Sequence, residues 1–278
     1  MRSAHTGPMD SLVDGPVGAT VVATLANSTL AEFRDRDELD ETRSSVIVPS
    51  PHALLEHVGA VVEGFAYGTY SEWREVAIGR PGLPASYRRV EENISKVASI
   101  GWWWSPVDLT RQAWFGPAGA FENSKSSRLE DRDDDPNLWW VEPWGAFMTS
   151  RLLGSGQSVS SICRDGHMVV DEEAINADVP IYFDASRKIF EVSCAREWVN
   201  LVERFPMQLK RGRMRPWSQW TGYDGPWVVP DWPSVAEEFD GVHVQLGAVL
   251  SSSYRRLHVE NGSTMLAGWN PDSTLWLK

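Results

Sequence analysis

The sequence is poor in cysteine and has no long apolar run. Cys163 and Cys194 are the only cysteines among 278 residues, and no Cys-x-x-Cys pair occurs. This excludes a disulfide framework and a cysteine-rich zinc site, and it favours free thiols in a reducing cytosol. No window reaches the roughly 18 consecutive apolar residues of a membrane span, and Asp10 and Asp14 interrupt the stretch where a signal peptide has its apolar core. We therefore expect a soluble, cytoplasmic protein without a membrane partner.

Positive charge is also scarce. The chain has 26 Lys and Arg residues against 38 Asp and Glu residues, which gives a net charge of −12. A surface that binds nucleic acid displaces counterions with positive charge, so this balance argues against DNA or RNA as a partner. The one basic run that stands out, Lys210–Arg215, is either a solvated loop or a local contact for a phosphate or an acidic partner.

The common catalytic and nucleotide-binding motifs are missing. The sequence contains no Gly-x-Ser-x-Gly, no Gly-x-Gly-x-x-Gly after a strand, no P-loop and no His-Glu-x-x-His. It therefore lacks the usual signatures of serine hydrolases, Rossmann folds, P-loop NTPases and zinc proteases. The acidic run Glu130–Asp135 lacks the alternating carboxylates and central glycine of a calcium loop, so we interpret it, like Asp171–Glu173, as solvated. We expect no metal.

Tryptophan, by contrast, is abundant. Its 15 residues outnumber the 9 Phe and 6 Tyr residues. Many of them, including Trp102–Trp104, Trp139, Trp140 and Trp144, fall in Gly101–Ser150, the part of the chain with the weakest periodicity. An indole offers a large apolar face and an N–H donor, so it suits cores, glycan platforms and partner interfaces. Two interpretations stay open, which are core packing and stacking on a protein partner or a glycan.

Apolar periodicity predicts several helices. Apolar residues repeat at three- and four-residue intervals over Leu54–Phe65, and Ser50-Pro51 supplies an N-cap and a first-turn proline. Similar spacing predicts helices over Arg89–Ile100, Trp198–Phe205 and Trp232–Phe239. The N-terminal half is therefore expected to be the more helical one.

The C-terminal half has a stronger strand signal. Ile181–Phe183 and Ile189–Val192 are expected as two short strands across a turn, and alternation over Val242–Leu250 predicts a half-buried strand. Thr264–Leu266 and Thr274–Leu277 add two more. This order favours an α+β fold with a mixed, mainly antiparallel sheet and short helices in the C-terminal half.

The same signals divide the chain into three parts. Residues 1–20 are expected to form a loose N-terminal arm, and residues 21–135 a mostly helical region with a Trp-rich loop. Residues 136–278 are expected to form the α+β domain, either separate from the preceding region or continuous with it.

Two segments of the C-terminal half carry a resemblance. Gly145–Ser150 followed by Ser158–Ser161 has the pattern of an aromatic strand that ends in Thr-Ser, with a small-residue helix start behind it. The tail Asp231–Leu277 places an acidic residue, Asp272, at the start of a terminal aromatic strand. With the Thr-Ser strand first and the acidic residue near the terminal strand, residues 139–278 resemble C-terminal modules of actinobacterial proteins and ADP-ribosyltransferase-like domains.

This resemblance implies an NAD-dependent ADP-ribosyltransferase or NAD glycohydrolase, with NAD as the substrate. In that family a Ser/Thr-bearing strand holds the nicotinamide end of NAD, and a late acidic residue orients the ribose and activates the acceptor. Carried onto this chain, Thr149 and Ser150 line the NAD pocket and Asp272 is the catalytic carboxylate, which stabilises the positive charge that builds at C1′. Arg151 and His243 are further candidates for NAD binding.

The chain departs from the family pattern at two points. The family has Glu where Asp272 stands, and its early Arg or His strand is not found in Leu138–Val141. Arg111 and Arg151 are nearby substitutes for that basic residue. The catalytic assignment therefore depends on where the fold places these side chains.

Plainer interpretations of the same residues stay open. Asn270-Pro271-Asp272 is a good turn by composition alone, and His243 is also typical of a partnered histidine on a half-exposed sheet face. The alternative functions are a non-enzymatic, Trp-rich interaction protein that binds a protein or a glycan, and a structural component of a phage or other assembly.

Overall fold

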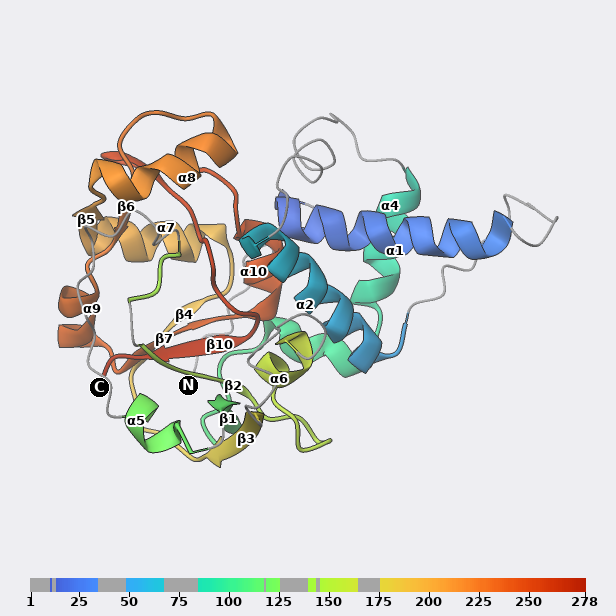
Figure 1. The fold of residues 1–278 in the computed structure, drawn as a ribbon, viewed down its shortest axis with the longest axis horizontal. Coiled ribbons are helices and arrows are strands. Elements are labelled where there is room, and N and C mark those ends of the chain that lie inside the picture. The colour runs from blue at the N-terminus through green and yellow to red at the C-terminus, as the bar shows by residue number, and fades with distance from the viewer. Residues whose placement is uncertain are drawn as a thin grey trace, which may run out of the picture.

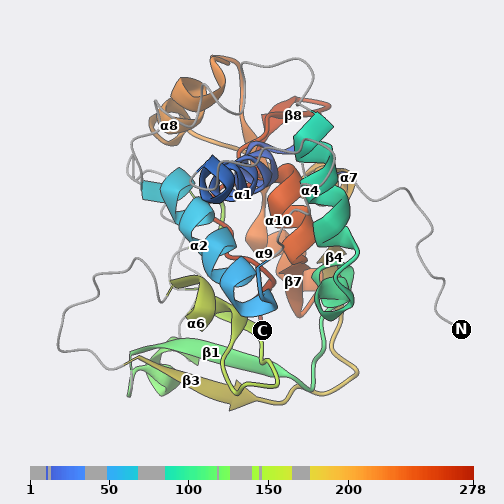
Figure 2. The same ribbon diagram turned by 90° about the vertical axis from the view of Figure 1, so that its right-hand side faces the viewer.

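A computed structural model describes residues 11, 14–34, 49–67, 85–117, 119–125, 140–143, 146–164 and 176–278. Within these residues the chain forms an α+β fold whose centre is a six-stranded sheet, as the sequence predicts. Figures 1 and 2 show α1, α2, α7 and α10 on one side of the sheet. Strands β1 and β3 lie at one edge of the sheet. No described helix is both long and apolar enough to cross a membrane. The two predicted acidic loops, at 130–135 and 171–173, lie outside the described residues.

The central sheet has the strand order β3-β1-β2-β10-β7-β4. Its strands are β1 Gln112–Pro117, β2 Phe147–Arg151, β3 Asn176–Ile181, β4 Ile189–Val192, β7 Gly241–Val244 and β10 Ser273–Trp276. Neighbouring strands are antiparallel except for the parallel pair β4 and β7, so the sheet is mixed and mainly antiparallel. Two small antiparallel pairs complete the strands: β5 Pro206–Gln208 with β6 Val228–Pro230, and β8 Leu257–Val259 with β9 Gly262–Thr264.

Helices from both halves of the chain surround the sheet. They are α1 Pro16–Arg34, α2 Pro51–Tyr67, α4 Ala85–Ser95, α5 Phe121–Lys125, α6 Val159–Arg164, α7 Ala195–Arg204, α8 Arg211–Thr221, α9 Trp232–Glu238, α10 Leu246–Ser252 and the 3₁₀ helix η2 Ala98–Trp104. The predicted start of α2 is confirmed, because the Ser50 hydroxyl accepts a hydrogen bond from the Ala53 N–H at 3.2 Å. The basic run at 210–215 enters α8 and is not a loop.

The N-terminal helices and the sheet share one apolar core. Val58 of α2, Ile94 of α4, Trp198 of α7 and Leu275 of β10 are buried in the same cluster. Strand β1, which belongs to the region expected to be mostly helical, is hydrogen-bonded between β2 and β3. Because one sheet includes β1 and the later strands, the described parts of both halves are packed together.

Close backbone approach explains one glycine of this core. Helix α2 crosses α6, and a Cβ at Gly59 would lie 2.1 Å from the carbonyl oxygen of Cys163. Only glycine permits this approach without a shift of one helix. Cys163 is buried and forms no disulfide, and its thiol donates to the carbonyl oxygen of Leu55 at 3.5 Å.

Several predictions of strands and helices are wrong in detail. The alternation over 242–250 is not one strand, because β7 ends at Val244 and helix α10 follows. Every residue of α10 is buried, so the helix has no exposed polar face. Without such a face, the sequence pattern of this helix cannot be told from that of a buried strand. Helix α4 ends at Ser95, and the predicted helix over 89–100 continues only as the 3₁₀ helix η2.

Another correction concerns strand pairing. Ile189–Val192 forms β4 and Ile181 ends β3, but these strands lie at opposite edges of the sheet and are not paired. A short connection favours a hairpin, yet here β3 pairs with β1 and β4 pairs with β7. The residues of the turn between β3 and β4 do not reveal that each strand pairs with a strand far away in the sequence.

Tryptophan contributes mainly to the interior of the described regions. The largest fully buried side chains include five indoles, which are those of Trp103, Trp198, Trp217, Trp227 and Trp269. Several contact one another edge to face, a favourable arrangement of aromatic rings. Of the triplet at 102–104, Trp102 and Trp104 are only partly buried and Trp103 is fully buried.

Candidate functional site

A polar row crosses the centre of the sheet. Glu191 of β4 lies opposite His243 of β7, His243 lies opposite Thr274 of β10, and Thr274 lies opposite Thr149 of β2. Directly paired residues of adjacent strands project to the same face, so these four side chains form a continuous line. His243, Thr274 and Thr149 are buried. The expectation that His243 lies on a half-exposed face is therefore wrong.

Two members of this row, Glu191 and His243, also belong to a series of side chains with alternating negative and positive charge. One carboxylate oxygen of Glu191 lies 2.7 Å from Nδ1 of His243, and Nε2 of His243 lies 3.5 Å from Oδ1 of Asp272. The other oxygen of Asp272 lies 3.6 Å from Nε of Arg151 and accepts a hydrogen bond from the Arg151 backbone N–H at 3.3 Å. We call Glu191, His243, Asp272 and Arg151 the charged tetrad.

The tetrad is electrically balanced at neutral pH. Burial by itself lowers the pKa of His243, but the carboxylates of Glu191 and Asp272 beside its two ring nitrogens raise the pKa to about 9. The imidazole is therefore protonated and positive, like Arg151, and faces two carboxylates. A protonated imidazole has no lone pair, so in this state His243 does not act as a base.

The two predicted hydroxyls are occupied by the protein itself. Thr149 donates to the amide oxygen of Gln112 at 2.7 Å and accepts from the indole N–H of Trp276 at 2.8 Å. Ser150 projects to the opposite face of β2, where its hydroxyl accepts from the backbone N–H of Ser160 at 2.9 Å. Thr149 and Ser150 are thus neighbours in the chain that do not line one surface.

Asp272 lies in the turn that its sequence predicts, next to β2. Ser273 pairs with Ser150, which places the Asp272 carboxylate beside Arg151. Asp272 has a φ of 49°, in the left-handed region that Asp tolerates better than most residues. Its side chain is almost fully buried. The fold thus brings Asp272, Thr149, Ser150, Arg151 and His243 together, although they are separated in the chain.

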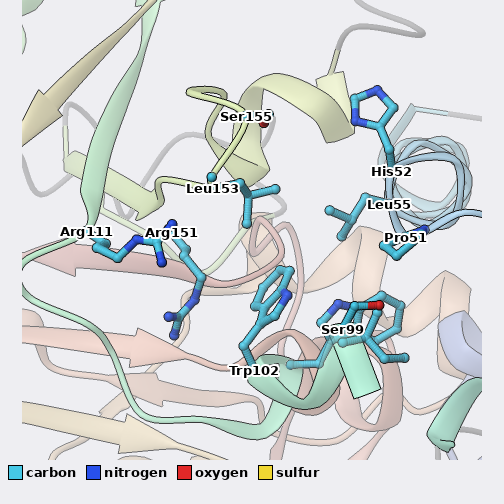
Figure 3. Close-up of a pocket in the computed structure, with 12 residues that line it drawn as sticks. Pro51, His52, Leu55, Ser99, Trp102, Arg111, Arg151, Leu153 and Ser155 are labelled. Atoms are coloured by element: carbon cyan, nitrogen blue, oxygen red, sulfur yellow. The ribbon is translucent and has the colours of Figure 1, made fainter. Parts of the chain in front are cut away.

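Of these five residues, Arg151 lines a hollow on the described part of the molecule. The hollow has a volume of about 400 Å³, and Arg151 and Arg111 line one part of it. Figure 3 shows both arginines on one side of the Trp102 indole, with Leu55 on the other side. The Arg151 guanidinium carbon lies 5.3 Å from the centre of the Trp102 ring, within the range of a cation–π contact. The hollow thus combines two cations with an apolar, aromatic wall.

The tetrad also holds the loop beside the hollow. Arg151 donates from Nη2 to the carbonyl oxygen of Pro106 at 3.2 Å, and the Val107 N–H donates to Glu191 at 2.8 Å. These residues follow directly on η2, which carries Trp102. Both ends of the tetrad therefore anchor the segment that supplies the aromatic wall.

The arrangement of the tetrad is that of an ion-pair chain. Glu191 and Asp272 contact opposite nitrogens of the His243 ring, so the three groups do not converge on one point. Within the described residues, no group of three or more His, Cys, Asp or Glu side chains is arranged to hold a metal ion.

Sequence reasoning missed Glu191 and Trp102 as parts of this site. Glu191 is a single acidic residue inside an otherwise apolar strand, and a charge in such a strand is a usable signal. Trp102 was one indole among many. No family model matches the chain, no curated protein matches its sequence, and no solved structure matches its fold.

Proposed function

We propose that the protein binds a nucleotide in the hollow at Arg111 and Arg151. The observation that carries this proposal is the pairing of two arginines with an indole face in one hollow. Guanidinium groups bind phosphate through charge-assisted, often bidentate hydrogen bonds, and an indole provides a stacking surface for a base. The overall charge of −12 repels anions at long range, so these two arginines must supply the local positive charge that holds the phosphate.

NAD is the nucleotide that the resemblance to ADP-ribosyltransferase-like domains favours. It carries two phosphates and two planar rings, which match the arginines and the aromatic wall. A volume of about 400 Å³ lies at the lower end of ligand pockets, which span roughly 300–1,000 Å³. The hollow therefore accommodates one nucleotide half of NAD, and the other half extends to the surface.

The test compares phosphorylated and unphosphorylated probes by isothermal titration calorimetry. AMP, ADP-ribose and NAD should bind to the native protein, while adenosine should bind at least about tenfold more weakly, since it lacks the group that the arginines hold. Arg111→Ala should reduce the affinity for AMP because Arg111 lines the hollow. Since Arg111 is exposed, the variant should fold like the native protein. Equal binding of AMP and adenosine would contradict the proposal.

NAD cleavage is a second candidate, favoured by the position of Asp272 directly beside Arg151. A carboxylate there is suited to stabilise positive charge on a ribose. The side chain is 1% exposed, so this chemistry requires the turn at 270–272 to open when NAD binds. The same samples should hydrolyse NAD, with water forming the new bond at C1′ as the nicotinamide leaves, so that nicotinamide and ADP-ribose are both released. Asp272→Asn, which keeps the size of the side chain, should abolish this release without abolishing NAD binding.

A further inference from the structure

Asp272 is shared between two cations and satisfies neither of them fully. Its carboxylate lies 3.5 Å from Nε2 of His243 and 3.6 Å from Nε of Arg151. Both distances exceed the roughly 2.7–2.9 Å of a charge-assisted N–H···O bond. Accordingly, Nε2 of His243, Oδ1 of Asp272 and Nε of Arg151 are buried without a hydrogen-bond partner among the described residues. The carboxylate sits between the two cations.

His243 is held in this position from its other side. Glu191 approaches Nδ1 at 2.7 Å, which is short enough for a strong charge-assisted bond. Thr274 lies opposite His243 on β10, and its hydroxyl makes no hydrogen bond within the described part of the chain. The charged groups that face the imidazole are therefore Glu191 and Asp272, with Arg151 behind Asp272.

We propose that His243 is a positioning residue that keeps Arg151 available to the ligand of the hollow. The positive charge of His243 attracts the Asp272 carboxylate away from Arg151. The Arg151 guanidinium is therefore not paired closely with Asp272, and its positive charge can act on a ligand in the hollow. When His243 is uncharged, Asp272 moves onto Arg151 and competes with the anion. This inference rests on the proposed nucleotide binding for its ligand, and it adds control by a buried residue that does not touch that ligand.

A double-mutant cycle tests the competition directly. With AMP as the probe, His243→Gln should weaken binding about tenfold, since the anion then loses much of its interaction with one of two arginines. In an Asp272→Asn background the same His243→Gln change should have no effect, because the competing carboxylate is gone. His258→Gln, at an exposed position on β8, is the matched control and should bind AMP like the native protein.

Chemical labelling of arginine supplies a readout that needs no ligand. Phenylglyoxal reacts with accessible guanidinium groups, and peptide mass spectrometry gives the labelling of Arg151 relative to the exposed Arg111. In His243→Gln this ratio should fall, because Asp272 then covers Arg151. A merely structural role for His243 predicts the opposite, since a loosened tetrad exposes Arg151 and raises the ratio.

Glu191→Gln keeps the test informative if His243→Gln does not fold. The Glu191 side chain is 28% exposed, and glutamine retains the oxygen that accepts from Val107. Without the Glu191 charge, His243 loses its proton at lower pH, so the fall in AMP affinity with rising pH should move to lower pH than in the native protein. An unchanged pH profile, or an unchanged or increased Arg151 ratio, overturns the inference. Failure of the native protein to bind any probe overturns the proposed function, while the labelling result still decides the role of His243.

Discussion

The two faces of the central sheet are built from neighbouring residues of the same four strands. On one face, Phe190, Val242, Leu275 and Met148 lie opposite one another across β4, β7, β10 and β2. One residue along each strand, the other face carries the row Glu191, His243, Thr274 and Thr149 in the same register. The first row packs into the main apolar core, and the second row shares Glu191 and His243 with the charged tetrad.

The comparison shows two ways of stabilising one sheet. Apolar side chains gain free energy from burial whatever their exact neighbours are, so the apolar row tolerates changes that conserve volume. Buried polar groups are stable only with specific partners, because an unpaired charge or hydroxyl loses its hydration. The apolar row therefore maintains the fold, whereas the polar row determines where Arg151 is held.

The largest effect is expected on the apolar face. Leu275→Ala should lower the free energy of unfolding by about 2–5 kcal/mol, because Leu275 is fully buried and truncation leaves a cavity. Urea denaturation followed by circular dichroism measures this loss. Leu275→Met, which conserves volume, is the control and should cost less than about 1.5 kcal/mol. Similar losses in both variants would show that the apolar row requires specific shapes.

The polar face should respond to pH. The pKa of His243 rises from its usual 6.5 to about 9 in the folded protein, so the folded state binds the His243 proton more tightly than the unfolded state. This contribution is fully present below pH 6.5 and is lost as pH rises through about 9. The loss is on the order of 3 kcal/mol by linkage, and urea unfolding across this window measures it.

His243→Gln provides the control for that pH dependence. Its stability should be lower than that of the native protein below pH 6.5 and should lack the decline toward pH 9. If stability still declines toward pH 9 in His243→Gln, other titratable groups cause the decline, and the tetrad does not make the polar face sensitive to pH.

The smallest expected effect is a difference in stability between variants of two threonines in the polar row. Thr149→Val should cost about 1–2 kcal/mol, because it leaves the buried groups of Gln112 and Trp276 without their hydroxyl partner. Thr274→Val removes a buried hydroxyl that bonds to nothing among the described residues, so it should be neutral or slightly stabilising. Thermal unfolding of the two variants measures the difference. Equal costs would mean that burial, and not pairing, sets the contribution of each hydroxyl.

Much of the fold could be predicted from local patterns. The apolar stripe of α7 and the Ser50 cap of α2 are local features, and both are confirmed. The prediction failed where a pattern fits two structures, as in α10, where a buried helix shows the same alternation as a strand. It failed again for the pairing of β3 and β4, because the partner of each strand is far away in sequence.

The candidate site was predictable only in part. Asp272, His243 and Arg151 were named from the sequence, and the structure brings them into contact. Thr149 and Ser150 were named as one pair, but strand alternation turns them to opposite faces. Their roles in NAD binding and catalysis remain predictions, which the AMP and nicotinamide measurements address.

The sequence by itself determined the α+β class, the acidic charge and the apolar alternation of the central strands, since these depend on composition and on residues close in the chain. Only the tertiary structure decided that β4, β7, β10 and β2 lie side by side in one register. That register aligns Glu191 with His243 and brings the turn at Asp272 beside Arg151. The physical reason is that a charge chain depends on distances of a few ångströms between segments far apart in sequence, and only the packed sheet sets those distances.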